Sequence, residues 1–165
     1  MAAPDKLLIL YEDFDDGRFS HIGRYGAGNQ FMAYTTYASP KHYHTEESTP
    51  DGQMIWRLHT NCFAILHRFD SDGHHLGTDI ERLEGIEDSE VRDQAKFEAI
   101  IDKLGQVEFC DIQVKPFRIE IGKIVHGLIY ECEFWEEDGE EHEWVMLEPN
   151  DIMFHPPWDS GEYST

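Results

Sequence analysis

The sequence predicts an α+β fold with a mainly antiparallel β-sheet, and three observations lead to this class. Short apolar runs separated by turn residues recur along the chain, one amphipathic helix is expected at 88–104, and a β-meander follows it. Strands joined by short turns pair in an antiparallel manner. The chain has 165 residues with ten Phe, seven Tyr and four Trp, so it can bury a core, and we expect a single domain over residues 1–165.

The first half of the chain is expected to form strands and turns. Lys6–Tyr11 is a short apolar strand candidate, and Gln30–Tyr37 is rich in residues that favour strands. The glycines of 23–28 lack the order of a phosphate-binding loop and are expected to form a turn or bulge into the second strand. Cys62–Phe69 has alternating apolar residues, and the Asp70–Gly73 turn leads into a returning strand.

The helix predicted over 88–104 has one apolar face. Its core-facing residues, spaced i, i+3, i+4 and i+7, are Phe97, Ile100, Ile101 and Leu104. Asp88 or Ser89 is expected to cap the helix by accepting a hydrogen bond from a first-turn amide, and Gly105 is placed to end it. We expect this helix to cover the apolar face of the meander that follows, because three strands with one apolar face need a cover.

The meander is predicted from alternating apolar residues. Phe117–Ile121 alternates with charged residues, and Gly122-Lys123 is expected to form a type II′ turn with Gly in the first central position. The strand Val125–Trp135 follows, and an Asp-Gly turn returns the chain to an apolar run at Trp144–Leu147. The sequence leaves open whether the glutamates between Glu131 and Glu143 face solvent or a ligand.

The charge of the chain narrows the classes of partner. Thirteen Lys and Arg against 34 Asp and Glu give a formal net charge of −21, which argues against binding to nucleic acid or to an anionic membrane, since both are polyanions. A protein partner with a basic surface is the complementary expectation. No secretory or membrane segment is recognised at the N-terminus, and three cysteines without paired spacing favour reduced thiols, so we expect a cytoplasmic protein.

Histidine pairs are the strongest candidates for chemistry. The metal-ligand candidates are His42 and His44, which form a His-x-His pair, and the adjacent His74 and His75. They support an alternative function as a small metal-dependent hydrolytic enzyme that uses loop histidines. No recognised catalytic motif is present, and we predict no catalytic residues and no cofactor.

The C-terminal segment 148–165 combines prolines with large aromatic residues, and we predict that it packs back on the domain. One interpretation is an aromatic clasp that seals the edge of the core. The other is a partner-binding surface, because rigid aromatic side chains dominate protein interfaces. The candidate partner-binding residues are Phe154, His155, Trp158 and Tyr163. A homo-oligomer that buries these aromatics against a second copy is a third possibility.

Three groups of residues carry a resemblance to a known family. They are Ile22-Gly23-Arg24-Tyr25 with Gln30-Phe31, Leu66-His67-Arg68-Phe69-Asp70 with Asp72-Gly73-His74, and Phe154-His155-Pro156-Pro157-Trp158-Asp159 with Tyr163-Ser164-Thr165. With these motifs the chain resembles small bacterial proteins that are labelled formate hydrogenlyase regulatory protein. The resemblance implies a cytoplasmic regulator that contacts another protein and does not read DNA. It supplies no catalytic residues.

Composition and resemblance together predict a non-enzymatic acidic protein that binds another protein. Two versions of this function are a regulator of an activator and an immunity protein that antagonises a basic toxin. They differ in the partner, which the sequence does not identify.

Overall fold

The computed structural model describes residues 2–14, 17–38 and 61–165, and it has the predicted α+β class. Within these residues the chain forms two five-stranded antiparallel sheets, a two-stranded sheet and one α-helix. The first sheet has the order β5-β4-β3-β2-β6, the second β12-β11-β10-β9-β8, and β1 pairs with β7. The strands are β1 (Leu7–Ile9), β2 (Ile22–Tyr25), β3 (Asn29–Ala38), β4 (Asn61–Phe69), β5 (His75–Leu83), β6 (Val107–Phe109), β7 (Ile112–Val114), β8 (Phe117–Ile121), β9 (Ile124–Trp135), β10 (Glu140–Glu148), β11 (Ile152–Phe154) and β12 (Tyr163–Ser164).

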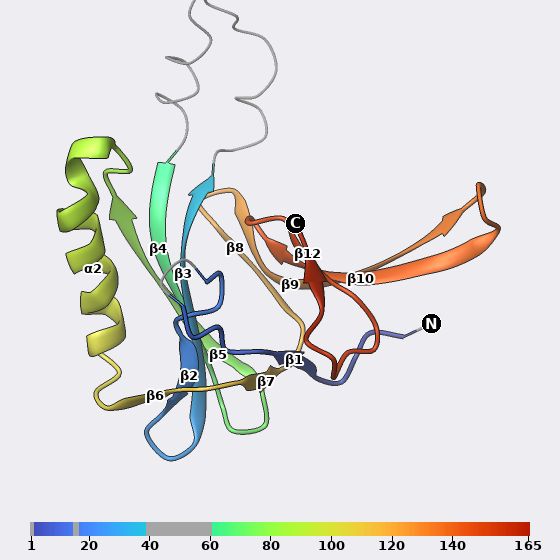
Figure 1. Cartoon of the computed structure of the whole chain (residues 1–165), viewed down its shortest axis with the longest axis horizontal. Coiled ribbons are helices and arrows are strands. Elements are labelled where there is room, and N and C mark those ends of the chain that lie inside the picture. Colours follow the sequence, from blue (N-terminus) through green and yellow to red (C-terminus); the bar gives the residue numbers. More distant parts are fainter. Residues whose placement is uncertain (1, 15–16, 39–60) are drawn as a thin grey trace, which may run out of the picture.

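The helix α2 (Glu90–Asp102) covers one face of the first sheet, and the second sheet lies over the other face (Figure 1). The helix packs on β3, β4 and β5, and the meander β8-β9-β10 lies on the opposite face of the first sheet (Figure 1). The expectation that the helix covers the meander is therefore wrong. The physical reason lies in β3 and β4, which are apolar on both faces and so need a cover on each side.

Alternation along β3 and β4 divides the core into two parts. Phe31 and Ala33 on β3, with Ala64 and Leu66 on β4, pack against the helix. The residues of opposite parity face the second sheet and form the larger core with it. The members of that core from these two strands are Met32, Tyr34, Ile65 and Phe69.

The helix has the predicted apolar stripe but not the predicted cap. Phe97, Ile100 and Ile101 are buried, and Leu104 packs against the same cluster. A 3-10 turn, η2 (Glu87–Ser89), precedes the helix, and the Ser89 side chain makes no capping bond to it. No helix in the described part of the chain is long and apolar enough to cross a membrane.

The turn between β8 and β9 differs from the predicted type. Ile121 pairs with Ile124, so the loop has two residues, as expected. Gly122 has a φ of 58° and Lys123 a φ of 65°, and positive φ at both central positions is the mark of a type I′ turn. The type II′ prediction is wrong because it assigned positive φ to the glycine alone.

The C-terminal segment lies against the N-terminal strand and the second sheet. β11 pairs with β10, and β12 pairs with β11. The backbone amide of Leu8 donates to the carbonyl of Trp158 at 2.9 Å, and the ring of Tyr163 stands edge-on to Phe19 at 5.1 Å between centroids. The end of the chain thus contacts its beginning through both backbone and aromatic side chains.

Candidate functional site

The hairpin of β9 and β10 extends beyond its neighbouring strands. β8 pairs only with Ile124–Leu128 of β9, and β11 pairs only with Val145–Leu147 of β10. Residues 131–144 therefore form a two-stranded ribbon without a third strand, and Figure 1 shows this ribbon projecting from the rest of the molecule. We call residues 131–144 the acidic arm.

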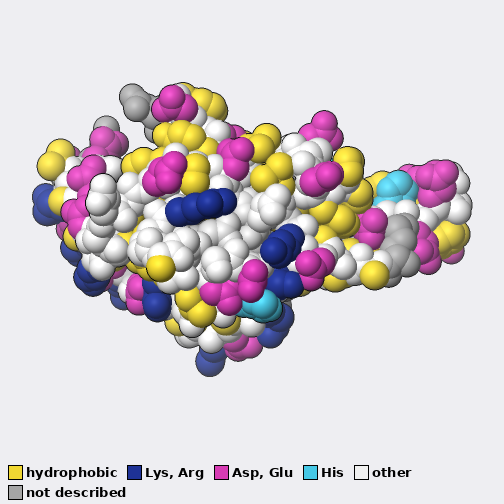
Figure 2. Space-filling view, turned by 90° about the horizontal axis from the view of Figure 1, so that it is seen from below, with side chains coloured by type: hydrophobic (Ala, Val, Ile, Leu, Met, Phe, Trp, Pro, Cys, Tyr) yellow, Lys and Arg dark blue, Asp and Glu magenta, His cyan; other side chains and the backbone are white. Residues whose placement is uncertain are grey.

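The acidic arm has eight carboxylates and no Lys or Arg. The carboxylates belong to Glu131, Glu133, Glu136, Glu137, Asp138, Glu140, Glu141 and Glu143. None of the thirteen Lys and Arg residues of the chain lies after Lys123. Figure 2 shows acidic and hydrophobic side chains on the projecting part and Lys and Arg side chains on the body. The arm thus presents a dense negative charge to solvent.

Contacts between the two strands hold one face of the acidic arm in place. Trp144 donates its indole N–H to Oε2 of Glu131, its opposite residue, at 2.7 Å. Nearer the end of the arm, the Trp135 ring stacks on the His142 ring with 3.9 Å between centroids and 23° between planes. Nε2 of His142 forms a hydrogen bond with Oδ2 of Asp138 at 2.6 Å. The arm is therefore an ordered element and not a loose loop.

The other face of the acidic arm continues from the core. Tyr130, next to the arm, packs against the core between the sheets and donates its hydroxyl to Oε2 of Glu143 at 2.9 Å. Burial and this hydrogen bond raise the pKa of Tyr130 to about 12. Further out, Phe134 is 58% exposed, and Trp135 on the opposite face is 44% exposed. Two large aromatic side chains are thus available to a partner among the carboxylates.

The turn at the end of the arm contains a group of three potential metal ligands. One ligand atom from each of Asp138, Glu140 and His142 lies within 4.8 Å of the others, and no second group of this kind occurs in the part of the chain that the structure describes. The Glu140 amide and His142 hold the pKa of Asp138 below its usual value. All three residues contact solvent, so the main effect of the hydrogen bonds that join Asp138 to the Glu140 amide and to His142 is to order the turn.

Of the histidines predicted as metal ligands, the described pair His74 and His75 does not form one site. His42 and His44 lie outside the described residues. His74 is at the surface with Nδ1 3.1 Å from Oδ2 of Asp70. His75 is half-buried, and its ring stacks on an aromatic ring of β8 with 4.2 Å between centroids. The adjacent pair therefore does not converge on one ion, and nothing in its geometry favours the hydrolytic enzyme.

A cluster of histidines lies instead in the core between the two sheets. His67 is fully buried, with Nε2 2.8 Å from the Tyr34 hydroxyl and Nδ1 2.7 Å from Oγ1 of Thr78. His126 is 1% exposed, and its Nδ1 has no hydrogen-bond partner among the described residues. Burial lowers the pKa of His67, His75 and His126. The sequence offered no signal for this cluster, because its members come from three strands.

The C-terminal residues predicted as a partner surface are only partly exposed. Phe154 is fully buried, so its assignment to a partner surface is wrong; the aromatic rings of Phe19 and Tyr163 enclose it. His155, Trp158 and Tyr163 are half-buried, and Tyr163 donates its hydroxyl to Glu12. The role of these three residues in binding a partner stays a prediction.

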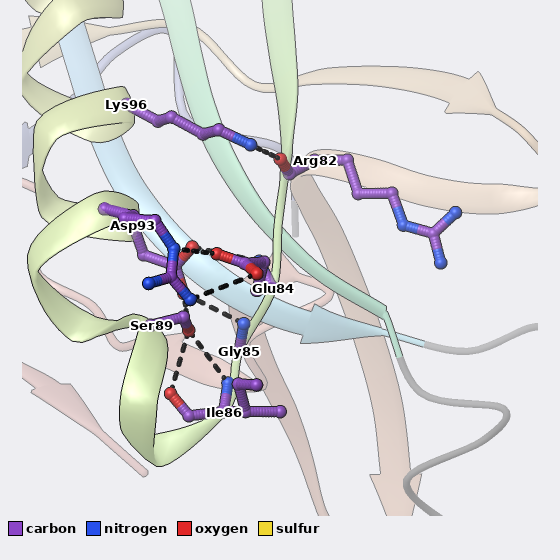
Figure 3. Close-up of polar contacts among 8 residues, drawn as sticks. Arg82, Glu84, Gly85, Ile86, Ser89, Asp93 and Lys96 are labelled. Atoms are coloured by element: carbon purple, nitrogen blue, oxygen red, sulfur yellow. Dashed lines mark hydrogen bonds and ion pairs between the residues drawn. The ribbon is translucent and has the colours of Figure 1, made fainter.

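A second surface lies where the chain passes from β5 into α2. Asp93 accepts hydrogen bonds from the backbone amides of Glu84 and Gly85, both at 2.9 Å, and from the Ser89 hydroxyl at 2.8 Å (Figure 3). Burial acts to raise the pKa of Asp93, but these three hydrogen bonds outweigh it and hold the pKa below its usual value. The contacts fix the loop against the helix.

This loop borders a groove of about 840 Å³ beside α2. Its apolar lining includes Tyr37, Ile86 and Val91, which are 56%, 55% and 84% exposed. Glu90 and Glu98 add carboxylates, and no Lys or Arg belongs to the described lining. The groove thus has the same chemical character as the acidic arm, with exposed apolar groups among negative charges.

The chain was compared with known proteins at three levels. No protein-family model, no curated protein and no solved structure matches it. The resemblance to the regulatory family therefore stays a prediction.

Proposed function

We propose that this chain is a non-enzymatic acidic protein that binds another protein through the acidic arm. The observation that carries the proposal is the placement of eight carboxylates, without a single Lys or Arg, on a ribbon that projects from the body. A surface with this charge attracts a basic surface and speeds its association.

The exposed aromatics of the arm add an anchor to this attraction. Phe134 and Trp135 expose large rings near the end of the ribbon, and such rings are frequent among the residues that dominate binding energy. Hydrogen bonds from Trp144 and Tyr130 already order the arm. Little conformational entropy is then lost on binding.

The partner is a protein with a basic face, and the biological role follows from its identity. A regulator of an activator fits the resemblance to the regulatory family, and an antagonist of a basic toxin fits the charge equally well. We place the interaction in the cytoplasm, since Cys62, Cys110 and Cys132 are all free thiols. A homo-oligomer is disfavoured at the arm, because two copies would bring like charges together.

The proposal is tested by the salt dependence of association with a partner isolated from the organism's own cells. The arm variant carries Glu133→Gln, Glu137→Gln and Glu141→Gln. The matched control removes the same charge from exposed residues outside the arm and the groove, with Asp72→Asn, Asp102→Asn and Glu120→Gln. The association rate of the wild type and of the control is expected to fall steeply with ionic strength, while that of the arm variant starts lower and falls less. Equal rates for both variants would contradict the proposal.

A further inference from the structure

The charge of the acidic arm is spaced along a line. A strand advances about 3.4 Å per residue, so the paired part of the arm is about 14 Å long from Glu131 to Trp135, where β9 ends. Over about 14 Å, one strand of nucleic acid has about four phosphates and a duplex about eight. The five carboxylates of this paired part, Glu131, Glu133, Glu140, Glu141 and Glu143, lie between these values. The arm therefore has a linear charge density like that of a nucleic acid.

Both faces of the ribbon present this charge. Glu131 and Glu133 are two residues apart on β9, which places them on one face about 7 Å from each other. Glu141 and Glu143 have the same spacing on β10 and lie on the opposite face. A basic groove that encloses a nucleic-acid strand meets negative charge on more than one side, and the ribbon offers the same arrangement.

Flat rings lie among the carboxylates, as bases lie among phosphates. Trp135 stacks on His142 at 3.9 Å between centroids, and Phe134 on the other face is 58% exposed. Proteins that bind single strands combine a basic groove with aromatic side chains on which bases stack. A surface that recognised charge alone would make no use of exposed flat rings placed between the carboxylates.

From these three observations we infer that the acidic arm occupies the single-stranded nucleic-acid groove of its partner and takes the place of the nucleic acid there. The inference rests on the proposed function above and names the class of the partner, a protein that binds single-stranded DNA or RNA. It agrees with the charge of the chain, which argues against direct binding to nucleic acid.

Competition between the arm and nucleic acid tests the inference. The protein is immobilised, and partners are captured from nuclease-treated extract of the organism's own cells. Only a partner that the wild type captures and the arm variant above does not capture is used further. Three competitors are compared, namely oligothymidylate and oligouridylate of about 16 nucleotides and polyglutamate of equal charge. One of the two oligonucleotides is expected to displace the partner at a concentration at least about tenfold below that of polyglutamate, because base stacking adds to the attraction between charges. The oligonucleotide that displaces the partner at the lower concentration shows whether the partner's groove naturally binds DNA or RNA.

The outcomes separate the inference from the proposed function. If no captured protein depends on the arm, the proposed function fails. If a partner depends on the arm but polyglutamate displaces it as well as the nucleotides do, charge alone is recognised and the inference is overturned while the proposed function stands.

An aromatic variant gives an independent readout. Trp135→Leu keeps the charge and apolar character of the arm but removes the flat ring, so binding is expected to weaken at least about tenfold. Phe14→Leu is the matched control, since Phe14 is 56% exposed outside the arm. The indole N–H resonance of Trp144, which is bonded to Glu131, reports that the arm of each variant is still folded. Unchanged binding by a folded Trp135→Leu protein would overturn the inference.

Discussion

Trp144 and Glu131 lie directly opposite each other where the acidic arm leaves the second sheet, and the indole N–H of Trp144 donates to Oε2 of Glu131 at 2.7 Å. The pair joins the two strands at the first position without a third strand. Isolated two-stranded ribbons are marginally stable in water, so cross-strand contacts of this kind decide whether the arm keeps its shape.

Trp144→Phe removes this hydrogen bond and keeps the aromatic ring. We expect it to loosen the arm and to lower the free energy of unfolding by less than about 1 kcal/mol, since exposed cross-strand pairs contribute roughly 0.2–1 kcal/mol. Amide hydrogen exchange over residues 131–143 is the measurement, and exchange there should become faster. Exchange that is faster only in the body, or nowhere, would show that the pair does not order the arm.

Two phenylalanines distinguish the core from the arm. Phe154 is fully buried against Phe19, so Phe154→Ala leaves a cavity and is expected to lower the free energy of unfolding by about 3–5 kcal/mol. Phe134 is 58% exposed, so Phe134→Ala should change it by less than about 0.5 kcal/mol. Chemical denaturation of both variants measures the difference, and comparable losses would contradict the assignment of Phe134 to the surface.

Lys123 holds a backbone conformation that favours glycine. Its φ of 65° lies in the left-handed region, which costs an ordinary residue about 1–2 kcal/mol. Glycine removes this cost, but it also loses more conformational entropy on folding, which offsets part of the gain. Lys123→Gly is therefore expected to raise the free energy of unfolding by about 0.5 kcal/mol. Lys103→Gly is the control and should lower it, because Lys103 has a φ of −62° at the end of α2. A destabilised Lys123→Gly protein in denaturation experiments would contradict the type I′ turn.

The buried histidines make stability depend on pH. Burial lowers the folded-state pKa of His67, His75 and His126, so the unfolded chain binds more protons as the pH falls. Their contribution is fully present above the unfolded pKa of about 6.5 and is lost progressively below it. We expect the free energy of unfolding to fall between about pH 7 and about pH 5, before the carboxylates titrate.

The control for this dependence is His126→Leu, which removes one of the three rings of the cluster between the sheets and a buried nitrogen without a described partner. The variant should show a shallower loss of stability between about pH 7 and about pH 5 in the same denaturation series. If the free energy of unfolding of the wild type did not change over this pH range, the result would contradict a neutral state of His67, His75 and His126 in the folded protein.

Local patterns in the sequence predicted much of the fold. Alternation identified the strands around Ile65 and Phe69, and the spacing of Phe97, Ile100 and Ile101 identified the core face of the helix. These signals are local, because a side chain's face follows from its position along its own strand or helix. Which sheet the helix covers does not follow from a local pattern, and the expectation that it covers the meander was wrong.

In the candidate site, too, the local features could be predicted from the sequence and the non-local ones could not. The run of carboxylates from Glu131 to Glu143 was visible in the sequence, but its exposure was not, because it depends on β8 and β11 ending before the hairpin does. Phe154 was predicted at a partner surface since its neighbourhood is rich in proline and aromatics. Its burial follows from the return of the C-terminal segment to Phe19, a contact between distant parts of the chain.

Native mass spectrometry of untagged protein, taken gently from its own cells, tests the central claim most directly. The wild type, the Glu133→Gln, Glu137→Gln, Glu141→Gln variant and the Asp72→Asn, Asp102→Asn, Glu120→Gln control are measured side by side. The acidic arm predicts a complex with a basic protein in the wild type and the control and a loss of that complex in the arm variant. A bare protein in all three samples, or a complex that survives neutralisation of the arm, would contradict it.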